Sequence, residues 1–307
     1  MPVMIKNDLP IKQVLEKENV FLIDERRAER QDIRPVDIVV MNLLHFRSLT
    51  EVEVLRSLSN TLLQVNVTFL APDKEGKTKP EKSCLDTPYV TFSEVRKKCF
   101  DGLIVTGAYN EDPEYEDIAY WEELKNIFDW ADSHVTSVFF LGWSAGAALY
   151  HYYGINKRIL PESLFGVYPQ KLSEKGLPLI RGFDDEFMVP HLRYTGVDDE
   201  ALAEKKNVAV LATSEDSGTY LCMNRDGSKV FCLGHPEFDR LALDNEYKRV
   251  SGEGGKIQIP CNYYPGDDTL STPPLQWRSH ANALFSNWLN YYVYQNTPFE
   301  LNRIVLE

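Results

Sequence analysis

One stretch of the sequence limits the possible folds more than any other. An apolar run at 138–141 ends at a glycine, and the residues GWSAG at 142–146 follow before a segment typical of a helix. A strand, a sharp turn and a helix in this order form a nucleophile elbow, in which glycines stand two residues before and after the nucleophile because the turn crowds the backbone there. The spacing predicts Ser144 as a nucleophile at a helix N-terminus, where backbone N–H groups favour a developing oxyanion. The alternative is a glycine-rich turn that binds a ligand or has no chemical role.

Upstream of this stretch, short apolar strands alternate with helical patterns. Continuous apolar strands joined by helices predict a mostly parallel sheet with helices on both faces. Ligands bind beyond the carboxyl ends of such strands, so the loops at 44–47, 107–111 and 142–146 are expected to converge on one pocket. Strands are expected at 37–43, 63–70 and 102–106, and helices at 50–63, 91–98 and 120–131.

The second half of the chain is richer in β-structure. Three short strands are expected at 208–212, 218–223 and 229–233, with a hairpin turn between the last two, and an aromatic helix is expected at 284–294. Repeats and linkers are absent from the pattern. The sequence therefore predicts an α/β fold as a single domain over residues 1–307, with 1–35 as an N-terminal arm and an added C-terminal β-hairpin and helix.

Two residues just beyond the last of these strands are candidates for a catalytic pair. A nucleophilic hydroxyl needs a base, and the base needs a group that orients it. His235 follows the strand, and Glu237 supplies a carboxylate two residues later. Downstream of an elbow, we interpret His235 as the general base and Glu237 as the residue that orients it. The alternative is a surface histidine in a proline-containing turn.

Charge and composition exclude several classes of partner. The net charge of −13 argues against nucleic acids and anionic membranes, which bind basic faces. Apolar runs are too short to span a bilayer, and no grouping of His, Cys, Asp or Glu has the spacing of a metal site. The five cysteines are an odd number without a close pair, which indicates reduced thiols of the cytoplasm.

Nearly the whole chain resembles the homoserine O-acyltransferases of the homoserine trans-succinylase type. The resemblance rests on motifs at 31–35, 61–65, 100–108, 120–124, 181–187, 234–237, 277–280 and 285–295. It implies a class I glutamine amidotransferase-like fold and transfer of an acyl group from acyl-CoA to the hydroxyl of homoserine, through an acyl-enzyme on a cysteine. It also implies a cytoplasmic homodimer that acts in methionine biosynthesis on an amino acid and an acyl-CoA co-substrate, without a resident cofactor.

The chain departs from this family at several site positions. The family's nucleophilic cysteine aligns with Gly142, and the elbow glycine two residues later aligns with Ser144. The family's oxyanion lysine aligns with Arg47, which keeps the charge but not the shape of an ammonium group. Leu192 replaces a serine, and Tyr109 replaces a loop proline.

Five other positions match the family pattern: His235, Glu237, Arg193, Glu246 and Arg249. The resemblance implies that the histidine and glutamate complete the catalytic triad and that the arginines bind the amino-acid substrate. Paired guanidinium groups suit a carboxylate. We therefore expect an acceptor that carries a carboxylate, which is homoserine or a similar amino acid.

Two interpretations of the altered elbow remain open. In the first, the strand runs two residues further and Ser144 is the nucleophile. A two-residue shift keeps each side chain on the same face of the strand. Gly142 and Gly146 bracket Ser144, and the elbow resembles that of the serine hydrolase peptidase E. In the second, covalent catalysis is lost and the protein binds a metabolite or transfers the acyl group directly. We predict an acyl-serine acyltransferase, with a serine hydrolase and an inactive metabolite-binding homologue as alternatives.

The resemblance also bears on the acyl donor. In the family, glutamate at the position of Glu111 accompanies acetyl-CoA, and glycine there accompanies succinyl-CoA. A carboxylate in the acyl pocket would repel the free carboxylate of a succinyl group. Glu111 therefore predicts acetyl-CoA as the donor, unless it is a surface residue of the surrounding acidic stretch.

Overall fold

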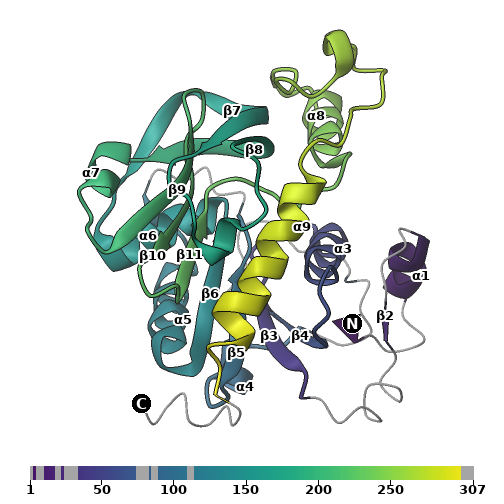
Figure 1. The fold of residues 1–307 in the computed structure, drawn as a ribbon. Coiled ribbons are helices and arrows are strands. Elements are labelled where there is room, and N and C mark those ends of the chain that lie inside the picture. Colours follow the sequence, from purple (N-terminus) through teal and green to yellow (C-terminus); the bar gives the residue numbers. More distant parts are fainter. Residues whose placement is uncertain are drawn as a thin grey trace.

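The computed structural model describes residues 3–4, 10–17, 22–23, 34–73, 83, 89–108 and 114–298. Within these ranges, eleven strands form one sheet in the order β2-β1-β4-β3-β5-β6-β11-β10-β9-β7-β8 (Figure 1). The pairings from β2 to β11 are parallel, and those from β11 to β8 are antiparallel. The strands are β1 (Val3–Met4), β2 (Leu22–Ile23), β3 (Val36–Met41), β4 (Val65–Leu70), β5 (Phe100–Val105), β6 (Val135–Leu141), β7 (Lys157–Leu172), β8 (Glu186–Val197), β9 (Val208–Ser214), β10 (Gly218–Asn224) and β11 (Lys229–Cys232).

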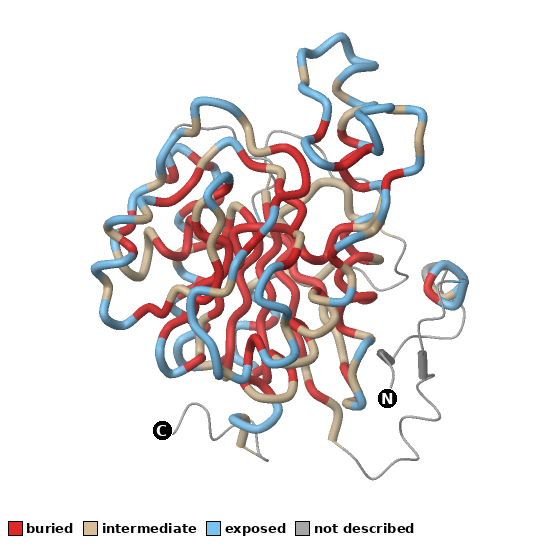
Figure 2. The backbone as a smooth tube through the Cα atoms, turned by 45° about the horizontal axis from the view of Figure 1, so that its top comes forward, coloured by how far each residue is buried: buried red, intermediate tan, exposed pale blue. Residues whose placement is uncertain are grey.

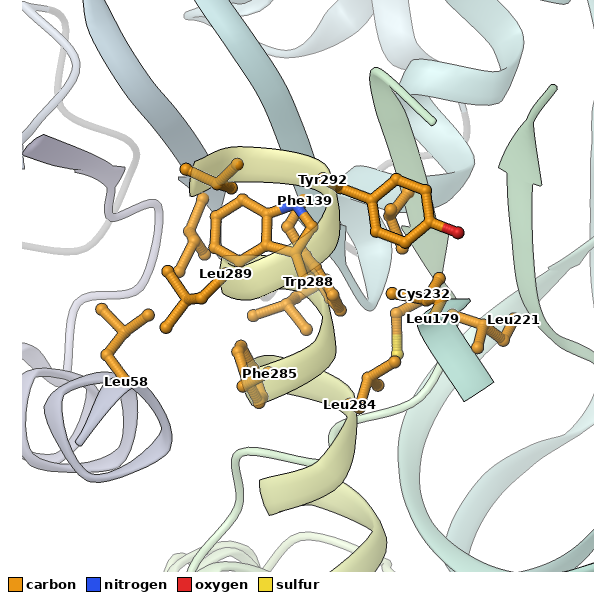
Figure 3. Close-up of a cluster of buried hydrophobic side chains, with 14 of the residues drawn as sticks. Leu58, Phe139, Leu179, Leu221, Cys232, Leu284, Phe285, Trp288, Leu289 and Tyr292 are labelled. Carbon is orange, nitrogen blue, oxygen red and sulfur yellow. The ribbon is translucent and has the colours of Figure 1, made fainter. Parts of the chain in front are cut away.

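Helices cover both faces of the parallel half, which is why its central strands are apolar on both sides. Successive residues of β6 illustrate this. Phe139 stacks on Phe285 of α9 (Arg278–Asn287), whereas Phe140 packs edge-on against Phe128 of α5 (Trp121–His134). Helix α3 (Arg47–Leu58) lies on the face of α9, and α6 (Trp143–Tyr153) lies on the face of α5. The buried residues gather at the centre of the molecule (Figure 2). The cluster on the α9 face of the sheet includes Phe139, Phe285 and Leu58 (Figure 3).

The sequence predicted the parallel half and the three later strands, and the structure confirms both. It did not predict the long β7–β8 hairpin, most of whose first strand is only partly buried. It also did not predict α8 (Ala242–Gly252), which with the following loop forms a projection above the carboxyl ends of the strands (Figure 1). A separate apolar cluster that includes Phe238, Leu243 and Trp277 anchors this projection.

Two expected helix boundaries are wrong. The helix expected at 50–63 spans Arg47–Leu58 instead, and Leu62, which was expected on its buried face, is 85% exposed. The C-terminal helix begins earlier than expected, at Arg278, and continues as the π-helical segment Trp288–Tyr294. The remaining helices are α1 (Pro10–Lys17), α4 (Phe92–Val95) and α7 (Asp199–Ala203).

Among the described residues, no helix is both long enough and apolar enough to cross a bilayer. The same residues contain no cluster of three or more His, Cys, Asp or Glu side chains arranged to hold a metal ion.

Candidate active site

The predicted elbow is present, but its apex is Gly142. Strand β6 ends at Leu141 and α6 begins at Trp143, so a single residue makes the turn. Gly142 has φ 55° and ψ −121°, a backbone conformation that side chains with a Cβ rarely adopt. The family's nucleophile position therefore keeps the strained geometry of an elbow while carrying no side chain.

Ser144 lies in the first turn of α6 rather than at the apex of the elbow, and its role as the nucleophile stays a prediction that this position does not support. The side chain is fully buried, and its hydroxyl lies 2.8 Å from the carbonyl oxygen of Val105 and 3.0 Å from that of Leu141. The same hydroxyl accepts a hydrogen bond from the Leu141 N–H at 3.1 Å. Because the helix starts directly after Gly142, Ser144 turns into the core and fastens the first turn of α6 to the ends of β5 and β6.

His235 and Glu237 form the hydrogen-bonded pair that the sequence suggested. His235 Nδ1 lies 2.8 Å from Glu237 Oε1, and the two residues are 6% and 5% exposed. The imidazole stacks on Phe238 with ring centroids 4.3 Å apart. A carboxylate beside Nδ1 favours the tautomer with the proton on Nδ1, which leaves the lone pair of Nε2 available to accept a proton.

The edge of this imidazole occupies the space where a nucleophile's side chain would begin. A Cβ added to Gly142 would come within 2.5 Å of His235 Nε2, and one added to Gly107 would lie 2.8 Å from Cε1. Both distances are shorter than real Cβ contacts, so the observed position of His235 requires glycine on both loops. The arrangement is a hydrogen-bonded histidine–glutamate pair that packs directly against an elbow whose apex has no side chain.

A cavity of about 520 Å³ opens beside Gly142. As expected from the parallel sheet, the loops after β3, β5 and β6 all reach it, through His45, Ala108 and Gly142. Sequence reasoning did not single out His45, although it follows a predicted strand end. It also missed other members of the wall: Tyr115, Trp143, Tyr194 and Lys256.

The cavity wall includes three residues that match the pattern of the resembled family, Arg193, Glu246 and Arg249. It also includes Leu192, which differs from that pattern. Arg193 is 7% exposed, and its hydrogen bonds to other described residues go only to the backbone carbonyls of Thr195 and Ser217. Burial lowers the pKa of Arg193 to about 10. Its Nε is buried without a hydrogen-bond acceptor in the described part of the chain. The charge of Asp199 favours the charged form of Arg193, but among the described residues the hydrogen-bond acceptors of the guanidinium are neutral carbonyls. A buried cation with such acceptors favours an anionic ligand.

Arg249 differs from Arg193 in already having carboxylate partners. Its Nε and Nη2 donate to the two oxygens of Glu246 at 3.0 and 2.6 Å, and its Nη1 donates to Glu253 at 3.0 Å. All three residues belong to or adjoin α8, so the projection supplies this part of the cavity wall. Arg249 and Glu246 form a bidentate pair, which fixes the orientation of both groups.

Two predicted substrate residues are not placed in the cavity. The Arg47 guanidinium lies over the Tyr89 ring, 4.3 Å from its centroid, and Arg47 does not belong to the cavity wall. Glu111 and Tyr109 lie outside the described residues, so the donor prediction has no structural counterpart.

Comparison with known proteins identifies the relatives of this chain. The homoserine O-succinyltransferase family model matches residues 2–299. A homoserine O-acetyltransferase of Lachnoclostridium phytofermentans is 50% identical over 98% of this chain and 100% of its own length. One of Acetivibrio thermocellus is 47% identical over 99% of this chain and 100% of its own length.

Solved structures agree on the fold. A glutamine amidotransferase of Thermotoga maritima matches with a TM-score of 0.56 at 12% identity, over 85% of this chain and 100% of that one. A second, from Methylobacillus flagellatus, gives 0.52 at 13% identity, over 84% and 95%. These confirm the expected class I glutamine amidotransferase-like α/β fold. With full-length relatives near 50% identity and the His235–Glu237 pair in place, the chain belongs to the homoserine O-succinyltransferase family and is an acyltransferase enzyme.

Proposed function

We propose that this enzyme transfers an acetyl group from acetyl-CoA to the side-chain hydroxyl of homoserine or a closely similar amino acid. The observation that carries the proposal is the cavity whose wall includes Gly142 and the buried cation Arg193. His235 is not part of that wall, but its imidazole packs against Gly142 and is hydrogen-bonded to Glu237. Both relatives described above are homoserine O-acetyltransferases, which supports acetyl transfer to homoserine. Acyl-CoA acts as a co-substrate, and the proposed chemistry uses no resident cofactor.

The charged groups of the cavity suit the two ends of an amino acid. Arg193, whose described partners are neutral carbonyls, receives the carboxylate, and a charge-assisted hydrogen bond of this kind contributes about 1.5–3 kcal/mol. Glu246, which is 7% exposed, receives the ammonium group while Arg249 holds its orientation. Leu192 makes the wall less polar than in the resembled family, which favours an acceptor with an apolar stretch between the α-carbon and the hydroxyl.

The transfer step follows from the position of His235. Its Nε2 takes the proton from the acceptor hydroxyl, and that oxygen attacks the thioester carbonyl carbon. The carbon–sulfur bond then breaks, and the departing CoA sulfur receives the proton from Nε2. Glu237 stabilises the transient imidazolium. The N-terminus of α6 lies at the cavity wall, where it favours negative charge on the carbonyl oxygen.

This scheme is direct transfer within a complex of both substrates, rather than passage through an acyl-serine. The buried, hydrogen-bonded Ser144 hydroxyl supports direct transfer and counts against a serine hydrolase. Gly142 has no side chain to act as a nucleophile, which on its own would suit a metabolite-binding protein without turnover, but membership of an acyltransferase family counts against that alternative.

Initial-rate kinetics with both substrates varied test the proposal. Direct transfer gives intersecting double-reciprocal lines, whereas a covalent intermediate gives parallel lines. Intact-mass measurement after mixing with acetyl-CoA alone should show no added acetyl group. His235→Asn should lower kcat by roughly 10²–10⁴-fold, the usual contribution of general base catalysis. Binding of homoserine without any CoA release in the presence of acetyl-CoA would contradict the proposal.

The donor is tested in the same assay. Acetyl-CoA should react faster than succinyl-CoA, and Glu111→Gly should narrow that ratio. Equal rates with both donors in the unmodified enzyme would contradict the proposed donor while leaving the acceptor site unaffected.

A further inference from the structure

Helix α3 buries two carboxylates, which an ordinary amphipathic helix would keep in water. Glu51 is fully buried and Glu53 is 2% exposed. Glu51 accepts a hydrogen bond from the Tyr89 hydroxyl at 2.9 Å, and Tyr89 accepts one from the side chain of Asn42 at the end of β3. Glu51 therefore supports the loop after β3. Glu53 points to a different loop.

Glu53 holds the loop that carries the catalytic pair. Its Oε1 accepts a hydrogen bond from the Asp239 N–H at 2.9 Å, across 186 residues of sequence. One turn later on α3, Arg56 pairs with the Asp239 carboxylate at 2.8 Å. Asp239 stands two residues after Glu237 and four after His235. The helix therefore fixes this loop at one residue through both its backbone and its side chain.

The surroundings of Glu53 favour its uncharged form. Burial, followed by the negative charges of Glu237 and Asp239, raises its pKa to about 8, against the opposing effects of the Asp239 N–H and the Arg56 guanidinium. At neutral pH the side chain is thus a carboxylic acid close to the catalytic carboxylate. Glu237 Oε2 is itself buried and has no hydrogen-bond partner among the described residues.

We propose that Glu53 is a positioning residue for the His235–Glu237 pair, acting as a neutral acid that holds their loop without adding a second negative charge beside Glu237. Glu237 then remains the carboxylate that orients His235. When Glu53 ionises in alkaline solution, its charge repels Glu237 and Asp239, which weakens the placement of the loop. This inference rests on the proposed function in one respect, namely that the His235–Glu237 pair serves acyl transfer.

The distinguishing variants are Glu53→Gln and Glu53→Ala. Glutamine keeps a carbonyl oxygen for the Asp239 N–H and stays neutral at every pH, so kcat near pH 7 should stay within about twofold of the parent enzyme. The parent should lose activity above about pH 8, and Glu53→Gln should not. Alanine removes the hydrogen-bond acceptor, and kcat should fall roughly 10-fold at all pH values, since the part-buried Asp239 N–H loses the bond that fixes the loop.

A titration that needs no turnover separates this inference from the proposed function. The His235 ring signals in NMR, assigned by their loss in His235→Asn, should shift with a midpoint near pH 8 when Glu53 ionises. That inflection should be absent in Glu53→Gln. It should persist in Glu51→Gln, the matched control, whose carboxylate lies on the same helix but serves the other loop.

Three results would overturn the inference. The first is an alkaline inflection that survives in Glu53→Gln, and the second is its absence from the parent protein. The third is equal loss of kcat near pH 7 in Glu53→Gln and Glu53→Ala. Failure of every variant to transfer an acyl group would count against the proposed function, while the His235 titration would still decide the role of Glu53.

Discussion

Gly142→Ala tests whether the edge of His235 fills the empty nucleophile position. The substitution adds one methyl group at a residue with φ 55° and ψ −121°. A strained backbone of this kind costs about 1–3 kcal/mol. The new Cβ would also stand within 2.5 Å of His235 Nε2, so the ring must move and lose its stacking on Phe238. An aromatic pair contributes about 0.5–1.5 kcal/mol, which brings the expected loss of unfolding free energy to roughly 1.5–4.5 kcal/mol.

Gly154→Ala is the matched control. Gly154 also has a positive φ, at 65°, but a Cβ there would meet nothing within 4 Å. Its cost should be limited to the left-handed backbone, about 1–2 kcal/mol. Urea unfolding of both variants gives the difference. Equal losses in the two would refute the contact between His235 and the elbow apex.

Gly142→Cys extends the same test to the chemistry. A thiol at the apex restores a nucleophile beside the base, once His235 has moved aside. Mixing this variant with acetyl-CoA should add one acetyl group by intact mass, and its double-reciprocal lines should become parallel. If the variant folds and no acetyl group is added, then the cavity does not present a thioester to the apex of the elbow.

Three further predictions concern buried groups. Ser144→Ala removes the hydroxyl that hydrogen-bonds the carbonyls of Val105 and Leu141, so the free energy of unfolding should fall by about 1–3 kcal/mol in thermal or urea unfolding. The kcat of this variant should stay within a few-fold of the parent value. Loss of turnover in a folded variant would instead support Ser144 as the nucleophile. Arg193→Lys should raise the KM for the acceptor roughly 10–100-fold by loss of guanidinium geometry, with the KM for acetyl-CoA unchanged, and an equal rise in both would contradict carboxylate binding there. The raised pKa of Glu53 means that the folded state holds a proton that the unfolded state releases. The contribution of Glu53 to stability is therefore full below pH 4.5 and is lost as the pH rises to about 8. Glu53→Gln should be more stable than the parent at pH 8, by at most about 5 kcal/mol at about 1.4 kcal/mol per pKa unit, and calorimetry that shows no gain would contradict a neutral Glu53.

Local sequence was sufficient for the elements whose residues pack in a regular pattern. The central strands are apolar on both faces and are bounded by loops, so their approximate extent and parallel arrangement could be predicted. The β7–β8 hairpin could not, because much of β7 is only partly buried and its alternation is interrupted. The predicted boundaries of helix α3 were wrong for a related reason. Its buried residues include Glu51, Glu53 and Arg56, which interrupt the apolar periodicity expected of a buried helix face.

The contact between His235 and Glu237 was predictable, whereas the apex of the elbow was not. His235 and Glu237 are two residues apart, so their contact depends mainly on the local conformation of the backbone between them. Glycine spacing around Ser144 could not reveal where the strand ends and the helix begins. That boundary depends on β11, which is not adjacent to β6 in the sequence. The two strands pair as far as Leu141, which lies opposite Cys232. The Cys232 carbonyl then accepts a hydrogen bond from the Gly142 N–H at 2.7 Å.

The sequence by itself determined that the chain forms an α/β fold of the homoserine O-succinyltransferase family. The alignment of Gly142 with that family's cysteine stays a prediction from the resemblance. Only the tertiary structure placed His235 against Gly142, because β6 and β11 are parallel neighbours and their carboxyl ends bring together residues 93 positions apart. It alone joined Glu53 to Asp239 across 186 residues. Contacts of this range depend on strand order and helix placement, which no local pattern of residues encodes.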